Sequence, residues 1–257
     1  MPVSILMKFI ATIVFVTSFS FGFSQKTIHV FVALCDNKNQ GIVPVSAKLG
    51  NGQDPYNNLY WGAMYGVKSF FKRSPEWQLM KTVKNPQAAI LERCIFKHAK
   101  EDVWLIADAY DGKEIKKATW GFLRTTAGYN PFLVHVDRKE IKAGSHAQLI
   151  AYVGHDGLMD FSIDNYPKPK DNKKRDAIIL ACISKPYFKD AVKSIGAKPL
   201  LWTTGLMAPE AYTLKAAING WISSESDEQI RQRAAEAYHK YQKCGVSAAK
   251  RLLVTGW

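Results

Sequence analysis

Residues 149–157 read LIAYVGHDG and residues 177–184 read AIILACIS, two apolar runs that each end in a chemically reactive side chain. Short, continuous apolar runs of this kind are typical of strands buried on both faces of a parallel sheet. His155 follows the first run and Cys182 follows the second, 27 positions later. If the two strands are neighbours, they place an imidazole and a thiol side by side at one edge of the sheet.

Further strands and helices alternate along the chain on both sides of these two runs. The expected strands are at residues 27–34, 77–83, 89–96, 101–110, 148–153, 176–181 and 199–202. The expected helices are at residues 55–71, 113–126, 186–195, 209–222 and 227–243. Ser226 and Gln229 have the spacing of a capping box at the start of the last of these helices. This alternation predicts an α/β fold with a largely parallel central sheet.

Several polar side chains lie at or just beyond the predicted strand ends. Open α/β sheets bind ligands outside the carboxyl ends of their strands, so these side chains are weaker candidates for substrate binding. They are Asp108, Asp111, Thr203 and Thr204. The two aspartates suit a cation or a substrate amine, although Asp111-Gly112 is also an ordinary turn sequence. The two threonines equally fit a plain transition from strand to loop.

The N-terminal residues have the features of a secretory signal peptide. A single lysine precedes an apolar run at residues 9–19, and a small-x-small pattern ends at Ser24. The alternative is an uncleaved N-terminal anchor. We therefore predict a signal peptide over residues 1–24 and a single α/β domain over residues 25–257, located in the periplasm or secreted after cleavage near Ser24.

Composition excludes several classes of protein and leaves the binding partner open. The 257 residues are 47% hydrophobic and carry a formal charge of +13, of which +12 remains after removal of residues 1–24. A disordered chain has fewer apolar residues, and a disulfide-dense chain has more cysteine. The densest basic run, PKPKDNKKR at residues 167–175, separates the two opening runs. The charge favours an anionic envelope surface as a partner, and no nucleic-acid-binding module is present in the sequence.

The cysteine and histidine spacings favour neither a metal nor a cofactor. Cys35, Cys94, Cys182 and Cys244 include no C-x-x-C pair, and the histidines include no H-x-x-x-H or H-E-x-x-H pair. The chain also has no glycine-rich phosphate loop. We therefore predict no metal site and no cofactor. In an oxidising compartment, the four cysteines leave three complete disulfide pairings open.

The two opening runs resemble the signature of the caspase-like (clan CD) cysteine peptidases, which include legumain, the gingipains, clostripain and the caspases. In that family one apolar strand ends in His-Gly and the next strand of the sheet ends in Ala-Cys. The resemblance covers residues 148–184 and implies a three-layer caspase-like sandwich. It implies Cys182 as the nucleophile, His155 as its partner, and the backbone N–H groups of Gly157 and Cys182 as oxyanion donors. Asp156 departs from the pattern, because it separates His155 from Gly157.

Two functional hypotheses follow from the sequence. The first is an exported cysteine peptidase that hydrolyses peptide bonds in peptide or protein substrates through a Cys182–His155 dyad, since a thiolate beside an imidazole is an effective nucleophile. The alternative is a non-catalytic, inactive caspase-like α/β binding protein of the cell envelope, in which Cys182 is buried or disulfide-bonded.

Overall fold

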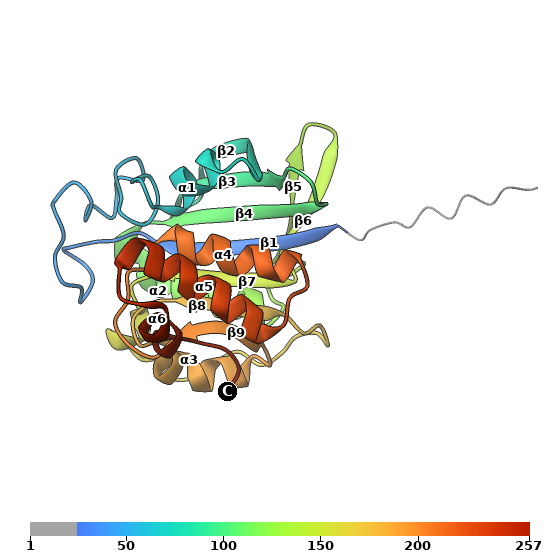
Figure 1. The fold of residues 1–257 in the computed structure, drawn as a ribbon. Helices are drawn as coiled ribbons and strands as arrows, with labels where there is room; N and C mark the ends of the chain where they lie inside the picture. The colour runs from blue at the N-terminus through green and yellow to red at the C-terminus, as the bar shows by residue number, and fades with distance from the viewer. Residues whose placement is uncertain (1–24) are drawn as a thin grey trace, which may run out of the picture.

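The computed structural model describes residues 25–257, and its core is an eight-stranded sheet (Figure 1). The strands are β1 Lys26–Ala33, β2 Trp77–Gln87, β3 Ile90–His98, β4 Val103–Tyr110, β7 Leu149–Gly154, β8 Asp176–Leu180, β9 Lys198–Thr203 and β10 Leu253–Val254. They lie in the order β10-β9-β8-β7-β1-β4-β3-β2. The strands from β9 to β4 are all parallel, and the outer strands pair antiparallel. The predicted α/β fold with a largely parallel central sheet is confirmed.

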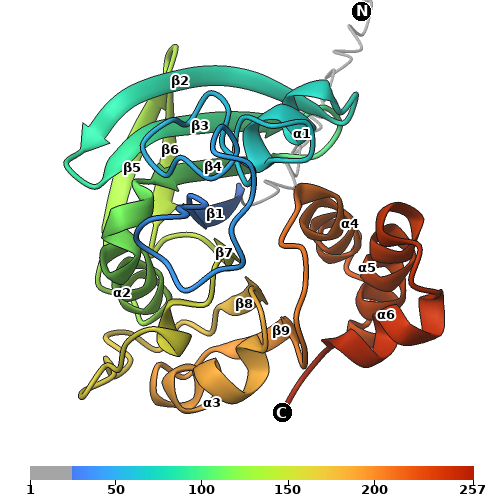
Figure 2. The same cartoon turned by 90° about the vertical axis from the view of Figure 1, so that its left-hand side faces the viewer.

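Helices cover both faces of this sheet (Figure 2). They are α1 Val67–Arg73, α2 Ile115–Thr126, α3 Ser184–Ser194, α4 Ala211–Ile222, α5 Asp227–Gln242 and α6 Val246–Leu252, with short 3-10 turns η1 at Gly112–Glu114 and η2 at Gly157–Met159. One buried apolar cluster joins α1, α4 and α5 to one face, and a second joins α2 and α3 to the other. The capping box of Ser226 and Gln229 is present at the start of α5, as predicted.

The helix predicted over residues 55–71 is wrong in its first part, because only α1 at its end is helical. The Asn58 side chain replaces helical hydrogen bonds: its Oδ1 accepts from the backbone N–H groups of Cys35 and Tyr60. Its Nδ2 donates to the Cys35 carbonyl at 2.8 Å. Asparagine competes with helix formation through such side-chain bonds. Residues 55–66 therefore form tight turns packed against the end of β1.

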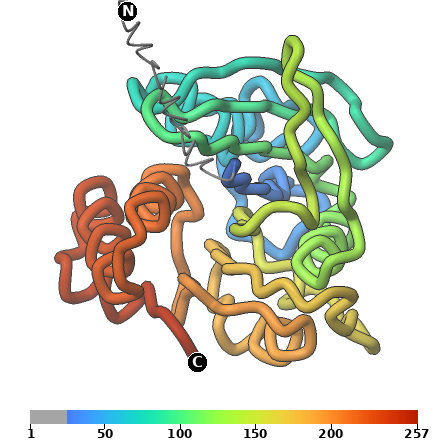
Figure 3. Tube along the Cα trace, turned by 90° about the vertical axis from the view of Figure 1, so that its right-hand side faces the viewer, coloured from blue at the N-terminus to red at the C-terminus, as the bar shows by residue number. Residues whose placement is uncertain are grey.

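A hairpin of β5 (Pro131–Val136) and β6 (Lys139–Gly144) was not expected from the sequence. It lies beside α2, on the same side of the sheet (Figure 3). Val134, Val136 and Ile141 pack against Trp104 and Ile106 of β4. Within PFLVHV, Val134 and Val136 are buried and Leu133 and His135 are exposed, an alternation typical of a strand with one covered face.

No helix within residues 25–257 is long and apolar enough to cross a membrane. The predicted signal peptide over residues 1–24 lies outside the part of the chain that the structure describes.

Candidate functional site

Strands β7 and β8 are neighbours and end at the same, carboxyl edge of the sheet, one residue before His155 and two residues before Cys182. The paired residues run from Leu149 and Asp176 to Val153 and Leu180, always 27 residues apart. Beyond the last pair, Gly154 with φ 140° precedes His155, and Ala181 precedes Cys182. Backbones of paired strands lie about 4.8 Å apart, so the two predicted catalytic residues follow directly neighbouring strands.

The His155 side chain is almost completely buried and is held by a carboxylate. Its Nε2 lies 2.8 Å from Oδ2 of Asp160, and its backbone carbonyl accepts a hydrogen bond from the Tyr152 hydroxyl at 2.8 Å. The same Asp160 oxygen accepts the Gly41 N–H at 3.0 Å. A carboxylate on one ring nitrogen holds the proton there and leaves the other, Nδ1, as the basic atom.

Cys182 lies at a sharp turn between β8 and α3. The next residue, Ile183, has φ 50° and ψ 31°, in the left-handed region that β-branched residues rarely occupy. Its N–H donates to the Gly205 carbonyl at 2.9 Å, which ties the turn to the loop after β9. Strained backbone of this kind clusters at functional sites, because the surrounding structure has to hold it in place.

The Cys182 thiol is half-buried and forms hydrogen bonds with the backbone of Met207 in that loop. Sγ accepts the Met207 N–H at 3.4 Å and donates to the Met207 carbonyl at 3.5 Å. Burial raises the pKa of the Cys182 thiol, the Met207 bond lowers it, and the negative charge of Asp156 raises it further. In this arrangement the thiol is held in its protonated form.

Asp156, which the sequence pattern marked only as an interruption, is a buried carboxyl group within the site. Its Oδ1 accepts the Leu158 N–H at 2.9 Å, and its Oδ2 is buried with no hydrogen-bond partner among residues 25–257. Burial, opposed by backbone hydrogen bonds and assisted by the charge of Asp160, raises the pKa of Asp156 to about 7. The site therefore contains a carboxyl group that exchanges its proton near neutral pH.

Replacing Asp156 by Asn is expected to lower the pKa of the Cys182 thiol, because it removes the charge that disfavours the thiolate. The rate of iodoacetamide labelling at pH 8 should rise several-fold at Cys182 and stay unchanged at the exposed Cys244. Mass spectrometry of the labelled peptides measures both rates in one sample. An unchanged Cys182 rate would show that the carboxylate exerts no field on the thiol.

The same substitution is expected to change how stability depends on pH. A carboxyl whose pKa is raised on folding stabilises the protein below its ordinary pKa near 4, and that stabilisation is lost as pH rises through about 7. Between pH 5 and pH 8, wild type should lose on the order of 2 kcal/mol of unfolding free energy through this carboxyl group. Asp156→Asn should not show this loss, because asparagine does not ionise. Urea unfolding curves at the two pH values test the sign.

The predicted oxyanion donors are the backbone N–H groups of Gly157 and of Cys182 itself, and a side chain at Gly157 would meet close neighbours. A Cβ at Gly157 would lie 2.8 Å from both the Phe161 ring and the Thr119 hydroxyl. The Gly157 backbone provides a hydrogen bond to the Tyr152 hydroxyl. The Gly157 N–H is therefore already hydrogen-bonded in this conformation. The Cys182 N–H lies at the turn that follows β8.

Asp108 lies inside β4 rather than beyond its end. Its carboxylate is fully buried and accepts hydrogen bonds from Arg93 Nε at 2.6 Å and Nη2 at 2.7 Å. His29 Nε2 lies 2.9 Å from the same group. Asp108 lines the α2 face of the sheet, whereas Cys182 packs with the cluster on the opposite face. The structure therefore does not bring Asp108 to the reactive pair.

The other three substrate-binding candidates form structural hydrogen bonds at the strand ends. Asp111 caps η1 and accepts from the Gln53 side chain at 2.7 Å. Thr203 is buried, and its hydroxyl donates to the Ala181 carbonyl and accepts the Ser184 N–H. Thr204 is exposed and donates to the Arg251 carbonyl at 2.7 Å.

A second thiol, Cys35, lies near Cys182 across the hydroxyl of Tyr60. The pKa of Tyr60 is raised by burial and by both thiols. Burial raises the pKa of Cys35 to about 11, so it is a poor nucleophile at neutral pH. All four cysteines are free thiols. Within the described chain, no group of three or more His, Cys, Asp or Glu side chains is placed to hold a metal ion.

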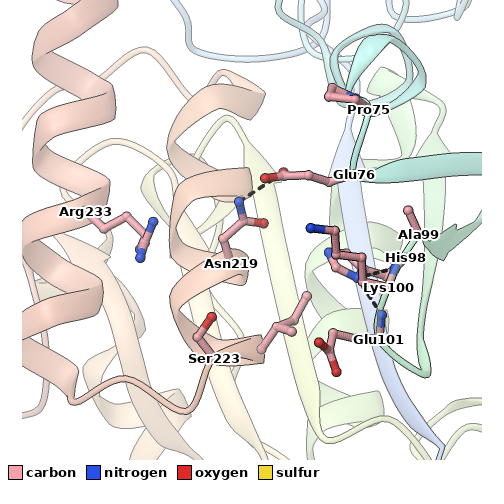
Figure 4. Close-up of a pocket in the computed structure, with 10 residues that line it drawn as sticks. Pro75, Glu76, His98, Ala99, Lys100, Glu101, Asn219, Ser223 and Arg233 are labelled. Atoms are coloured by element: carbon pink, nitrogen blue, oxygen red, sulfur yellow. Dashed lines mark hydrogen bonds between the residues drawn. The ribbon is translucent and has the colours of Figure 1, made fainter.

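A separate pocket of about 430 Å³ lies at the other edge of the parallel strands, near the β3–β4 turn (Figure 4). Glu76 accepts the Asn219 Nδ2 there at 3.1 Å. The ring of His98 accepts the backbone N–H of Glu101 at 3.0 Å. Because the reactive pair lies at the carboxyl edge, this pocket is not part of the candidate site.

Comparison with known proteins identified no relative: no family model, no curated protein and no solved structure matches the chain.

Proposed function

We propose that this protein is a cysteine peptidase that hydrolyses peptide bonds with Cys182 as the nucleophile and His155 as the acid/base partner. The observation that carries the proposal is that β7 and β8 are neighbouring parallel strands that end at one edge of the sheet, just before His155 and Cys182. Neither residue depends on a long flexible loop for its position, because each follows its strand within two residues.

The sheet order supports the finer expectation of a caspase-like sandwich. In the order β4-β1-β7-β8, the histidine follows the strand next to β1 and the cysteine follows the strand after that. Helices lie on both faces of these strands. This agrees with the resemblance of residues 148–184 to the clan CD signature, in which neighbouring sheet strands end in histidine and cysteine.

The proposed mechanism uses the groups already placed at the site. The Cys182 thiol passes its proton to His155, and the thiolate attacks the scissile carbonyl to form a tetrahedral oxyanion. Protonated His155 then gives its proton to the leaving amine, and water hydrolyses the remaining thioester. Asp160 holds the imidazole orientation through Nε2, a positioning role that leaves the proton transfers to Nδ1.

The arrangement of the thiol corresponds to a resting state. Cys182 is bonded to Met207 in the loop between β9 and α4, and burial together with Asp156 favours the neutral thiol. Substrate binding has to displace this loop contact before the thiolate can attack. Substrates are expected among peptides or proteins in the periplasm or outside the cell, as the predicted signal peptide indicates.

The non-catalytic alternative is favoured by a specific observation. Within the described structure the Cys182 thiol is bonded to Met207 and not to His155, and its pKa is raised. A structural cysteine in a binding protein has these properties. The two functions therefore differ in whether His155 activates the thiol.

Thiol labelling of the full chain separates the two functions. Peptidyl chloromethyl ketones bind as a substrate does and can displace the Met207 contact, so at least one of a small set should alkylate Cys182 faster than it alkylates free cysteine at pH 7. His155→Ala should reduce that rate by about tenfold or more, because the imidazole supports the thiolate. Cys244→Ser serves as the matched background, since it removes the exposed thiol. A Cys182 rate at or below that of free cysteine, and unchanged by His155→Ala, would support the binding protein instead.

A further inference from the structure

A cavity of about 560 Å³ lies on the α2 face of the sheet, away from the reactive pair. Its floor is formed by β1, β3 and β4, and its walls are α2 and the start of β5, which lie side by side in Figure 2. Cys182 packs with the cluster on the other face. The volume is within the range of small-molecule sites, which run from about 300 to 1,000 Å³.

The floor of the cavity consists of buried polar side chains that bond one another. Asp108 and Arg93 form a bidentate ion pair, and His29 bonds the same carboxylate. His29 is 2% exposed and lines the cavity, yet its Nδ1 is buried without a hydrogen-bond partner among residues 25–257. Burial lowers the pKa of His29, so the ring is neutral and Nδ1 is an acceptor that lacks a donor.

Two arginine side chains of the cavity form cation–π contacts with aromatic rings. The Arg93 guanidinium lies 4.4 Å from the Phe132 ring, and the Arg124 guanidinium lies 4.7 Å from the Tyr129 ring. Arg93 is neutralised by Asp108, and the rim residue Lys117 pairs with Glu114 at 2.8 Å. Arg124 is the cavity cation that has no carboxylate partner in the described residues. Arg124 therefore provides a cation with which a carboxylate group of a ligand can pair.

We infer that this cavity binds a small aromatic carboxylate. The carboxylate pairs with the edge of Arg124, and the ring stacks among Trp120, Tyr129 and Phe132, which line the wall and rim. This site is independent of the proposed peptidase function, because it lies on the other face of the sheet.

Isothermal titration of the full chain with benzoate, 4-hydroxyphenylacetate and indole-3-acetate tests the inference, with the matching neutral amides as controls. At least one carboxylate should bind saturably and at least about tenfold more tightly than its amide, because a charge-assisted hydrogen bond is lost in the amide. Arg124→Gln should remove this preference. Lys117→Gln is the matched control and should change affinity by no more than about twofold, since Lys117 is exposed and already paired.

Three results would overturn the inference. They are the absence of saturable binding for all three acids, equal affinity for acid and amide, and a preference that survives Arg124→Gln. Phenyl phosphate is a further arm: tighter binding of phenyl phosphate than of benzoate would overturn the assignment of a monoanionic carboxylate. Circular dichroism of each variant separates lost binding from lost fold.

Discussion

The Cys182→Ala variant is expected to lose peptide hydrolysis by at least about 10³-fold, because the proposed reaction forms its covalent bond at Sγ. His155→Ala should lower activity to a similar level, since residues that act as one unit are strongly non-additive. The double variant should therefore be no worse than either single variant. Release of amine from a peptide library, followed by mass spectrometry, measures all three.

The control for this experiment is the Cys244→Ser variant, which removes an exposed thiol in the turn between α5 and α6. It should keep its activity, because Cys244 lies outside the candidate site. If wild type and Cys182→Ala cleave the same peptides at the same rate, the activity belongs to a contaminant or another site. In that case Cys182 is not the nucleophile.

The Arg93→Met variant is expected to be destabilised by about 3–5 kcal/mol, the cost of leaving one member of a buried ion pair alone. Asp108 is fully buried and takes two hydrogen bonds from Arg93. Burial opposes the charge of Asp108, but the bonds from Arg93 and His29 hold its pKa below the ordinary value. Methionine has nearly the length of the arginine stem, so the main change is the lost charge.

The expected loss has a definite pH dependence. In wild type the paired Asp108 contributes stability above its ordinary pKa near 4, and this is lost as pH falls. Without Arg93, burial raises the Asp108 pKa, so protonation at low pH relieves the variant. The difference from wild type should be smaller at pH 5 than at pH 8, measured by urea unfolding.

A double variant provides the matched control. Arg93→Met with Asp108→Asn removes both charges and should recover most of the lost unfolding free energy, as neutral replacements of buried pairs commonly do. If Arg93→Met alone unfolds at the wild-type urea concentration at pH 8, the ion pair contributes little. The buried polar floor of the α2 cavity would then need another explanation.

The strands that form the reactive edge were predictable because their signal is local. The apolar run before His155 and the run before Cys182 became β7 and β8 within about a residue. A parallel strand buried on both faces has to be apolar along its whole length, so the sequence records it directly. The placement of each reactive residue within two residues of its strand end was also present in the sequence.

The secondary-structure predictions failed where side-chain hydrogen bonds or tertiary packing, rather than the spacing of apolar residues, determine the backbone conformation. Apolar spacing over residues 55–71 favoured a helix, but the bonds from Asn58 to Cys35 and Tyr60 fold its first part into turns. The β5–β6 hairpin was missed although its alternation was visible, because it packs on a sheet whose position the sequence does not specify.

The sequence by itself determined the α/β class, the largely parallel core and the two apolar strands that precede His155 and Cys182, while the pairing of those strands is known from the structure. Tertiary structure alone decided which groups surround them: Asp160 on His155, Met207 and Asp156 at Cys182, and Arg93 on Asp108. The physical reason is that hydrophobic periodicity is a property of a few consecutive residues. Burial and hydrogen-bond partners depend instead on residues that are distant in the chain, and these set the pKa and availability of each group.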